Sequence, residues 1–296
     1  MEIAYYPGCT LHASSRLYDI QARLVLGRLG IELREIEDWN CCGATSAAKT
    51  DEFLSIALPA RNLGIADASP YAEMVIPCSS CYSRTLVAQK RLADDPALRE
   101  AVNAGLGQKQ KVEGRIKIRS ILELLAGKVR DGGFKDKVVK KLEGLRPACY
   151  YGCLLTRFPV DIKSLPEEVV MEGGVENPQG METVLLALGA KPLDWSYKTD
   201  CCGASASVND TDMSLRLMSK ILDDAINRGA NCLVTTCPMC QFNLDAWQDR
   251  TGQGYSLPVY FITELAGVAM GIDAREMQLD RHFVDAMGLL RELRLI

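Results

Sequence analysis

Histidine is scarce in this chain of 296 residues, which contains only His12 and His282. A metal site built from this sequence must therefore be rich in sulfur. No apolar run approaches the ~20 residues that a helix needs to cross a bilayer. Residues 1–6 lack the basic start and apolar core of a signal peptide. We therefore expect a soluble, cytoplasmic protein with no transmembrane segment.

Strong charge and the common cofactor motifs are also missing. The net charge of −4 gives no indication of nucleic-acid binding. No Gly-x-Gly-x-x-Gly follows a strand pattern, so the sequence carries no flavin or nicotinamide fingerprint. The ferredoxin pattern Cys-x-x-Cys-x-x-Cys-x-x-x-Cys-Pro is absent too. If the chain carries out redox chemistry, it needs a partner that delivers electrons.

Cysteine, in contrast, is abundant, and ten of the twelve cysteines form one pattern that occurs twice. The first copy consists of Cys9, the pair Cys41-Cys42 before Gly43, and Cys78-x-x-Cys81. The second consists of Cys153, the pair Cys201-Cys202 before Gly203, and Cys237-x-x-Cys240. Four thiolates complete a zinc site or an ordinary four-iron cluster, so five in each copy indicate a centre with a fifth sulfur. Cys149 and Cys232 have no counterpart, and we interpret them as buried apolar residues.

The repeat predicts a duplicated domain. The Cys-Cys-Gly elements match at an offset of 160 residues and the Cys-x-x-Cys elements at 159, whereas the single cysteines match at 144. About fifteen extra residues therefore lie between Cys153 and Met181, where several prolines and glycines predict an inserted loop. We place the first domain, with a mainly helical linker segment, at residues 1–145 and the second at 146–296.

Each half alternates between strand and helix patterns. In the first half, residues 2–6, 31–36 and 73–77 read as strands, and residues 18–29 and 51–67 as helices. In the second half, residues 182–188 and 211–228 read as helices and 232–235 as a strand. This alternation predicts an α/β fold with a small parallel sheet flanked by helices in each domain. Because reactive groups collect at the carboxyl ends of parallel strands, the cysteines of each half should converge on one edge.

The doubled cysteine pattern resembles the paired cysteine-rich "CCG" domains of the heterodisulfide reductase B subunit, over essentially the whole chain. The same motif occurs in a membrane-anchor type of succinate dehydrogenase and in iron–sulfur subunits of glycolate and lactate oxidation. One departure is the spacing before the cysteine pair, which is 31 residues in the first half and 47 in the second. The family spacing is usually in the thirties.

The resemblance implies a catalytic iron–sulfur subunit that reduces a disulfide to two thiols, as in methanogenesis, where the substrate is the coenzyme M–coenzyme B heterodisulfide. It implies two noncubane [4Fe-4S] clusters with the disulfide between them. The implied ligands are Cys9, Cys41, Cys42, Cys78 and Cys81 for one cluster, and Cys153, Cys201, Cys202, Cys237 and Cys240 for the other. The implied partners within the same multisubunit complex are a ferredoxin-like iron–sulfur protein and a flavin-containing protein.

Other residues near the cysteines are candidates for substrate contacts. An anionic substrate calls for cations, and the nearest are Lys49, Arg84, Arg157 and Lys198, although each is also compatible with a solvated surface role. His12 is a candidate proton donor to a leaving thiolate, or a residue that hydrogen-bonds a loop. The alternative function is electron transfer within a 2-hydroxyacid oxidase or succinate dehydrogenase-like complex, without any disulfide chemistry.

Overall fold

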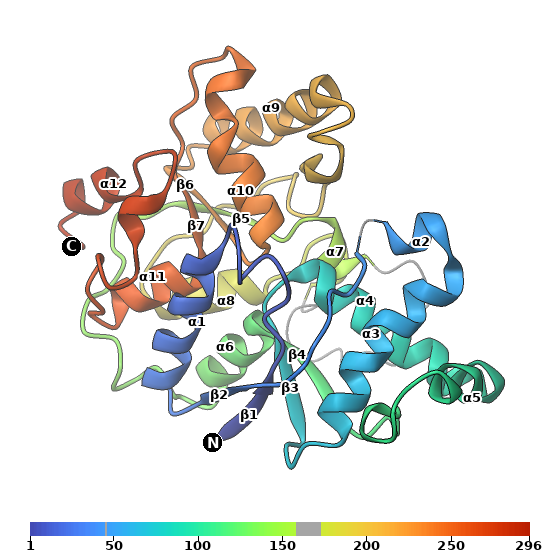
Figure 1. Cartoon of the computed structure of the whole chain (residues 1–296). Coiled ribbons are helices and arrows are strands. Elements are labelled where there is room, and N and C mark those ends of the chain that lie inside the picture. Colours follow the sequence, from blue (N-terminus) through green and yellow to red (C-terminus); the bar gives the residue numbers. More distant parts are fainter. Residues whose placement is uncertain (45, 158–172) are drawn as a thin grey trace.

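Two parallel β-sheets organise the chain in the computed structural model, which describes residues 1–44, 46–157 and 173–296 (Figure 1). The first sheet has the order β2-β1-β3-β4 and the second the order β5-β6-β7. Their strands are β1 (Glu2–Tyr5), β2 (Glu32–Glu35), β3 (Glu73–Ile76), β4 (Lys117–Ser120), β5 (Pro147–Tyr150), β6 (Cys232–Thr235) and β7 (Val259–Phe261). Every pairing is parallel, which confirms the predicted fold class.

Helices flank both sheets. In the first half they are α1 (Arg16–Arg28), α2 (Ala47–Thr50), α3 (Glu52–Asp67), α4 (Ser79–Asp94), α5 (Pro96–Ala104) and α6 (Ile121–Arg130). In the second half they are α7 (Cys153–Thr156), α8 (Gly180–Ala187), α9 (Thr211–Asn227), α10 (Pro238–Ala246), α11 (Ile262–Ala269) and α12 (Ala286–Glu292). None of the described helices has both the length and the apolar character that crossing a bilayer requires.

The long helices that follow the two cysteine pairs, α3 and α9, each begin at an aspartate cap. Asp51 accepts a hydrogen bond from the backbone N–H of Leu54 at 2.8 Å. Asp210 accepts one from the N–H of Met213 at 3.0 Å. Each carboxylate satisfies a backbone donor that the first turn of a helix leaves free. The two repeats therefore start this helix in the same way.

The segment between the halves departs from its mainly helical prediction. It contains α5 and α6 but also β4, which pairs with β3 from Glu73↔Lys117 to Ile76↔Ser120. The strand was missed because its four residues include two charged ones, and its identity as a strand depends on the ladder with β3. Most of the predicted inserted loop, residues 158–172, lies outside the described residues.

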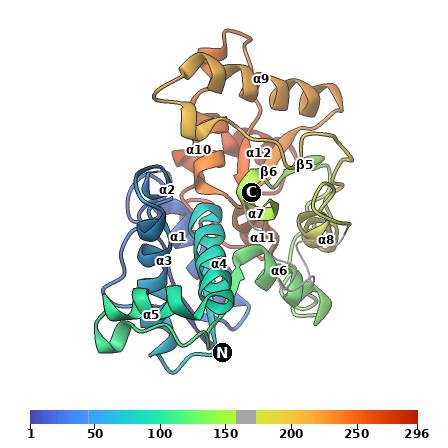
Figure 2. The ribbon, with the colours of Figure 1, turned by 90° about the vertical axis from the view of Figure 1, so that its right-hand side faces the viewer.

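The two halves pack against each other through helices of both. Helix α1 of the first half packs on α11 of the second, and α8 of the second half packs on α6 of the first (Figures 1 and 2). At the first of these contacts the ring of Tyr18 stacks on that of Phe261, with centroids 4.0 Å apart. One hydrophobic core therefore contains residues of both halves. The domain boundary after residue 145 stays a prediction.

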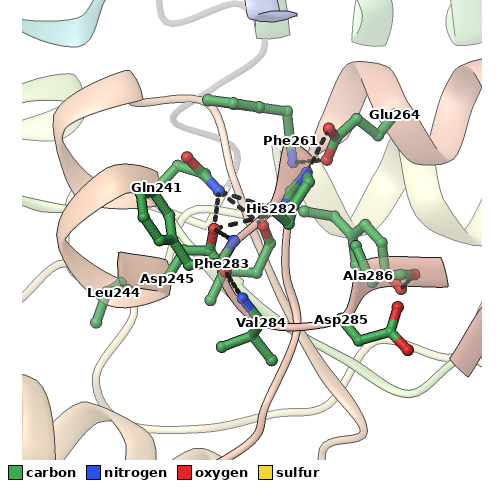
Figure 3. A network of polar contacts seen from close by, with 12 residues as sticks. Gln241, Leu244, Asp245, Phe261, Glu264, His282, Phe283, Val284, Asp285 and Ala286 are labelled. Carbon is green, nitrogen blue, oxygen red and sulfur yellow. Dashed lines mark hydrogen bonds and ion pairs between the residues drawn. The ribbon is translucent and has the colours of Figure 1, made fainter. Parts of the chain in front are cut away.

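A buried polar network holds this junction together (Figure 3). The imidazole of His282 lies 2.8 Å from Glu264 on α11 and 3.6 Å from Asp245 on α10, and the His282 side chain is fully buried. Glu264 also accepts a hydrogen bond from Gln21 of α1 at 2.7 Å. Burial alone would lower the pKa of His282, but the two carboxylates outweigh it and raise that pKa to about 9. The charged imidazole thus links α10, α11 and the C-terminal segment, and Glu264 extends the link to α1.

Candidate metal centre

All the cysteine elements of the first half, and two of the three in the second, follow the carboxyl ends of neighbouring strands, whereas the pair Cys201-Cys202 follows an irregular segment after α8. In the first half, Cys9 follows β1, the pair Cys41-Cys42 follows β2, and Cys78 follows β3, and these three strands are neighbours in their sheet. The five thiols of the first half line one cavity of about 360 Å³. The five of the second half line another, of about 70 Å³. The structure thus brings together each set of cysteines that the sequence singled out, while their role as ligands stays a prediction.

Contacts between thiols repeat from one half to the other. The Sγ atoms of Cys42 and Cys81 lie 3.3 Å apart, and those of Cys202 and Cys240 lie 3.5 Å apart. Within each pair of adjacent cysteines, the first is exposed and the second is buried, so their thiols face different directions. The described residues contain no group of three or more His, Cys, Asp or Glu side chains arranged to hold a lone metal ion. What they offer is two wider rings of five sulfurs.

Hydrogen bonds among the thiols lower the pKa of at least one thiol in each set and raise the pKa of the partner thiols Cys41, Cys81 and Cys153. Hydrogen bonds with the thiols of Cys41 and Cys81 lower the pKa of Cys42 to about 4. In the second set, a hydrogen bond from Cys153 lowers the pKa of Cys201 to about 6. Thiolate is the form of cysteine that binds metals, so each ring contains a sulfur prepared for coordination at neutral pH.

Two tyrosines that the sequence analysis did not single out position the cysteine pairs. The hydroxyl of Tyr6 donates to the carbonyl of Asn40 at 2.8 Å, and that of Tyr150 donates to the carbonyl of Asp200 at 2.5 Å. In both halves the tyrosine stands three residues before the single cysteine, and its acceptor stands directly before the pair. The hydrogen bond therefore ties the two cysteine elements together. The sequence signal that could have identified these tyrosines is their repetition at the same position before the single cysteine of each half.

Side chains of the helices after the Cys-x-x-Cys elements hold the other side of the loops. Arg84 of α4 donates to the carbonyl of Ala44 at 3.1 Å, and Asn243 of α10 donates to that of Cys202 at 2.8 Å. Arg84 and Asn243 are separated by the repeat offset of 159. Arg84, a predicted substrate residue, thus supports the cysteine loop in this structure.

Like Arg84, the other predicted substrate residues do not line either cavity among the described residues. Lys198 is buried and forms an ion pair with Glu182 at 2.7 Å, whereas Arg157 pairs with Glu176 and bonds the hydroxyl of Thr199. Lys49 is exposed on α2. His12 pairs with Glu35 at 3.1 Å, with its side chain about half exposed. Their contact with a substrate stays a prediction.

Two observations show that the residues fit an iron–sulfur group. Among the described residues, each cavity is lined by five thiols and by no carboxylate or imidazole, so sulfur is the available metal donor. Gly8 adopts a φ of +74°, and a Cβ there would lie 2.8 Å from Sγ of Cys81. Gly152 repeats this with Sγ of Cys240 at 3.0 Å. Both thiols therefore depend on a bare backbone beside them.

A matched pair of glycine substitutions tests this dependence. Gly8→Ala should displace Cys81 and lower the iron content of the anaerobically purified protein. Gly30→Ala is the control, because Gly30 has a φ of +76° with open space around the added Cβ. Both variants should lose roughly 1 kcal/mol of stability to backbone strain. Equal iron in the two variants would contradict a steric role for Gly8.

Comparison with known proteins finds a matching domain family and relatives of similar length. The cysteine-rich CCG domain matches residues 3–84 and again residues 148–245. The chain is 32% identical to the 8-methylmenaquinol:fumarate reductase membrane anchor subunit of Wolinella succinogenes, covering 97% of this chain and 99% of that protein. It is 26% identical to the B subunit of the ferredoxin:CoB-CoM heterodisulfide reductase of Methanosarcina mazei, covering 99% of this chain and 97% of that protein.

A solved structure shares the fold. A hypothetical protein from Helicobacter pylori superposes with a TM-score of 0.70 at 16% identity, over 96% of this chain and 52% of that one. This chain therefore spans about half the length of that protein.

Two matches to the CCG domain and full-length relatives at this similarity agree with the two five-cysteine cavities. The chain belongs to the family of cysteine-rich CCG domain proteins, with two copies of that domain, and heterodisulfide reductase B subunits are among its full-length relatives.

Proposed function

We propose that this protein is the catalytic iron–sulfur subunit of a heterodisulfide reductase-type complex. In this proposal it holds two noncubane [4Fe-4S] clusters, each through the five cysteines of one cavity, and reduces a disulfide between them. One observation carries it: the two cavities share a wall of four residues, Ala44, Ser80, Ala204 and Met239. Two sulfur rings that adjoin in this way suit a substrate with two reacting sulfurs.

The reaction balances as one disulfide, two electrons and two protons giving two thiols. When bound, the clusters would supply one electron each and an iron that accepts a product sulfur. The chain's own residues hold the rings in place, through the tyrosine bonds to Asn40 and Asp200 and the bonds from Arg84 and Asn243. The hydroxyls of Thr10, Ser14 and Ser46 line the first cavity and offer hydrogen bonds to a product thiolate.

Electrons must come from a partner, because the sequence contains neither a nucleotide fingerprint nor a ferredoxin pattern. The proposal assigns this role to a ferredoxin-like iron–sulfur protein and a flavin-containing protein of one cytoplasmic complex. The relative from Methanosarcina mazei, a subunit of a ferredoxin:CoB-CoM heterodisulfide reductase, supports electron delivery by an iron–sulfur protein within a complex.

The test is an assay of anaerobically purified protein with dithionite-reduced methyl viologen as the electron donor. We expect roughly eight irons per chain and oxidation of the viologen when the coenzyme M–coenzyme B heterodisulfide or bis(2-hydroxyethyl) disulfide is added. The Cys202→Ala variant should lose this activity. Cys232→Ala is the matched control, since Cys232 is buried in β6 outside both cavities. Zinc or two irons in place of eight would contradict the proposal.

The similarity to the fumarate reductase anchor protein favours a second candidate function. In this alternative the chain passes electrons between a redox partner and a flavin enzyme, such as a succinate dehydrogenase or a 2-hydroxyacid oxidase, without touching a disulfide. The same iron content without disulfide turnover, together with reoxidation of the reduced protein by the flavin enzyme, would favour it.

A further inference from the structure

The wall between the two cavities is built from equivalent positions of the two repeats. Ala44 and Ala204 follow the two Cys-Cys-Gly elements, and Ser80 and Met239 are the third residues of the two Cys-x-x-Cys elements. All four line both cavities. Across the wall, the hydroxyl of Ser80 on α4 lies 3.5 Å from Sδ of Met239 on α10. The duplication thus places its two copies face to face at this contact.

This wall is unsymmetrical at one position only. The alanines match, whereas a serine in the first repeat faces a methionine in the second. Methionine is long, unbranched and able to change rotamer at low energy. Met239 is therefore the largest wall residue and the one best able to move.

The cavities differ in the same sense. The first measures about 360 Å³ and the second about 70 Å³, although each is lined by five thiols. The lining of the first cavity includes Pro238, Met239 and Phe242 of α10, which form an apolar side. Phe242 is 38% exposed, so this side reaches solvent. For a ligand seated in the first cavity, the shared wall, with Met239 as its largest residue, stands on the side of the second-half cysteines.

We propose that Met239 is a specificity-determining residue, which limits how far a ligand seated in the first cavity reaches toward the second-half cysteines. The ligand packs a neutral carbon chain on Pro238, Met239 and Phe242, because these side chains provide apolar and aromatic contact. A slim disulfide passes Met239, and a bulky one is held back. This inference rests on the proposed function, since it treats the shared wall as part of the substrate site.

Two variants at this position separate size from stability. Met239→Ser installs the residue of the first repeat and shortens the wall, whereas Met239→Leu keeps its volume and apolar character. Two neutral disulfides serve as probes, the slim bis(2-hydroxyethyl) disulfide and the bulky 4,4′-dithiodipyridine. The measured quantity is the ratio of their KM values in the cluster-loaded protein with reduced methyl viologen, corrected for turnover without protein. We expect Met239→Ser to shift this ratio toward the bulky disulfide by about tenfold, and Met239→Leu to keep the wild-type ratio.

A binding experiment gives a second readout that needs no turnover. The cluster-loaded protein is titrated with 2-mercaptoethanol or 4-mercaptopyridine, and its EPR spectrum is recorded. We expect 4-mercaptopyridine to perturb one cluster signal in the wild type and both signals in Met239→Ser. Loss of the signal of each half in the Cys42→Ala and Cys202→Ala variants identifies which signal belongs to which half.

The outcomes distinguish this inference from the proposed function. The same KM ratio and the same EPR response in wild type, Met239→Ser and Met239→Leu would overturn the role of Met239. An equal shift in Met239→Ser and Met239→Leu would also overturn it, because it would indicate a packing effect. If no disulfide is reduced but the thiol titration depends on Met239 as expected, the proposed reaction fails and the inference about ligand access stands.

Discussion

Anaerobically purified Cys42→Ala protein should contain about half the wild-type iron, roughly four irons per chain in place of roughly eight. Cys42 is buried at 1% exposure, and its Sγ lies 3.3 Å from that of Cys81. Its replacement removes one of the five sulfurs that line the first cavity. The second ring keeps all five thiols and lies beyond the shared wall, so its cluster should remain. Iron and sulfide analysis together with EPR of the reduced protein measures the loss, and one of two cluster signals should disappear.

Cys149→Ala is the matched control for this experiment. Cys149 is also fully buried, but it lies in β5 and lines neither cavity among the described residues. The control should keep all its iron while losing roughly 1 kcal/mol of packing. Full iron and an unchanged EPR spectrum in Cys42→Ala would show that four sulfurs suffice in the first half. Reduced iron in both variants would point to a general folding defect.

His282→Gln should lower the free energy of unfolding by about 3–5 kcal/mol at pH 7. Its imidazole lies between Glu264 and Asp245, which are both buried. Removing the cation leaves two buried carboxylates without their shared counter-charge. Urea unfolding followed by circular dichroism measures the loss. Arg281→Gln is the control, because Arg281 is 71% exposed and its ion pair with Asp280 is worth less than about 1 kcal/mol.

The effect of His282→Gln should also depend on pH. The pKa of His282 is raised from 6.5 to about 9 in the folded protein. A raised pKa means that the folded state binds the proton more tightly than the unfolded state. The resulting stabilisation is fully present below about pH 6.5 and is lost as the pH rises through about 9. The difference in stability between wild type and variant should therefore shrink as the pH rises from about 6.5 to about 9, and a constant difference would indicate that the imidazole acts through packing alone.

Four strands that precede cysteines, β1, β2, β3 and β6, were predicted from sequence because their patterns are local, whereas β5 before Cys153 was missed. Residues 74–77 form an apolar run before Cys78, and the structure has β3 from Glu73 to Ile76. β4 was missed because Lys117–Ser120 is stabilised as a strand mainly by its pairing with β3. Dependence on a distant partner also explains why the role of Lys198 was not predicted. In the sequence, Lys198 stands three residues before Cys201 and is a candidate cation for the substrate. Its ion pair with Glu182 depends on a helix sixteen residues earlier, and no local pattern indicates that pairing.

Spacing along the chain already indicated sulfur ligands, two sets of five and a duplicated α/β domain, because ligand type and repeat offset are properties of the covalent sequence. Packing established how the two copies meet. Helices α1 and α8 each pack on a helix of the opposite half, and the same junction includes the contact of Ser80 with Met239 and a shared wall between the two cavities. The His282 network likewise joins side chains from four separate segments. Within it, Gln21 bonds Glu264 across 243 positions of sequence, a separation at which only the folded chain brings two groups together.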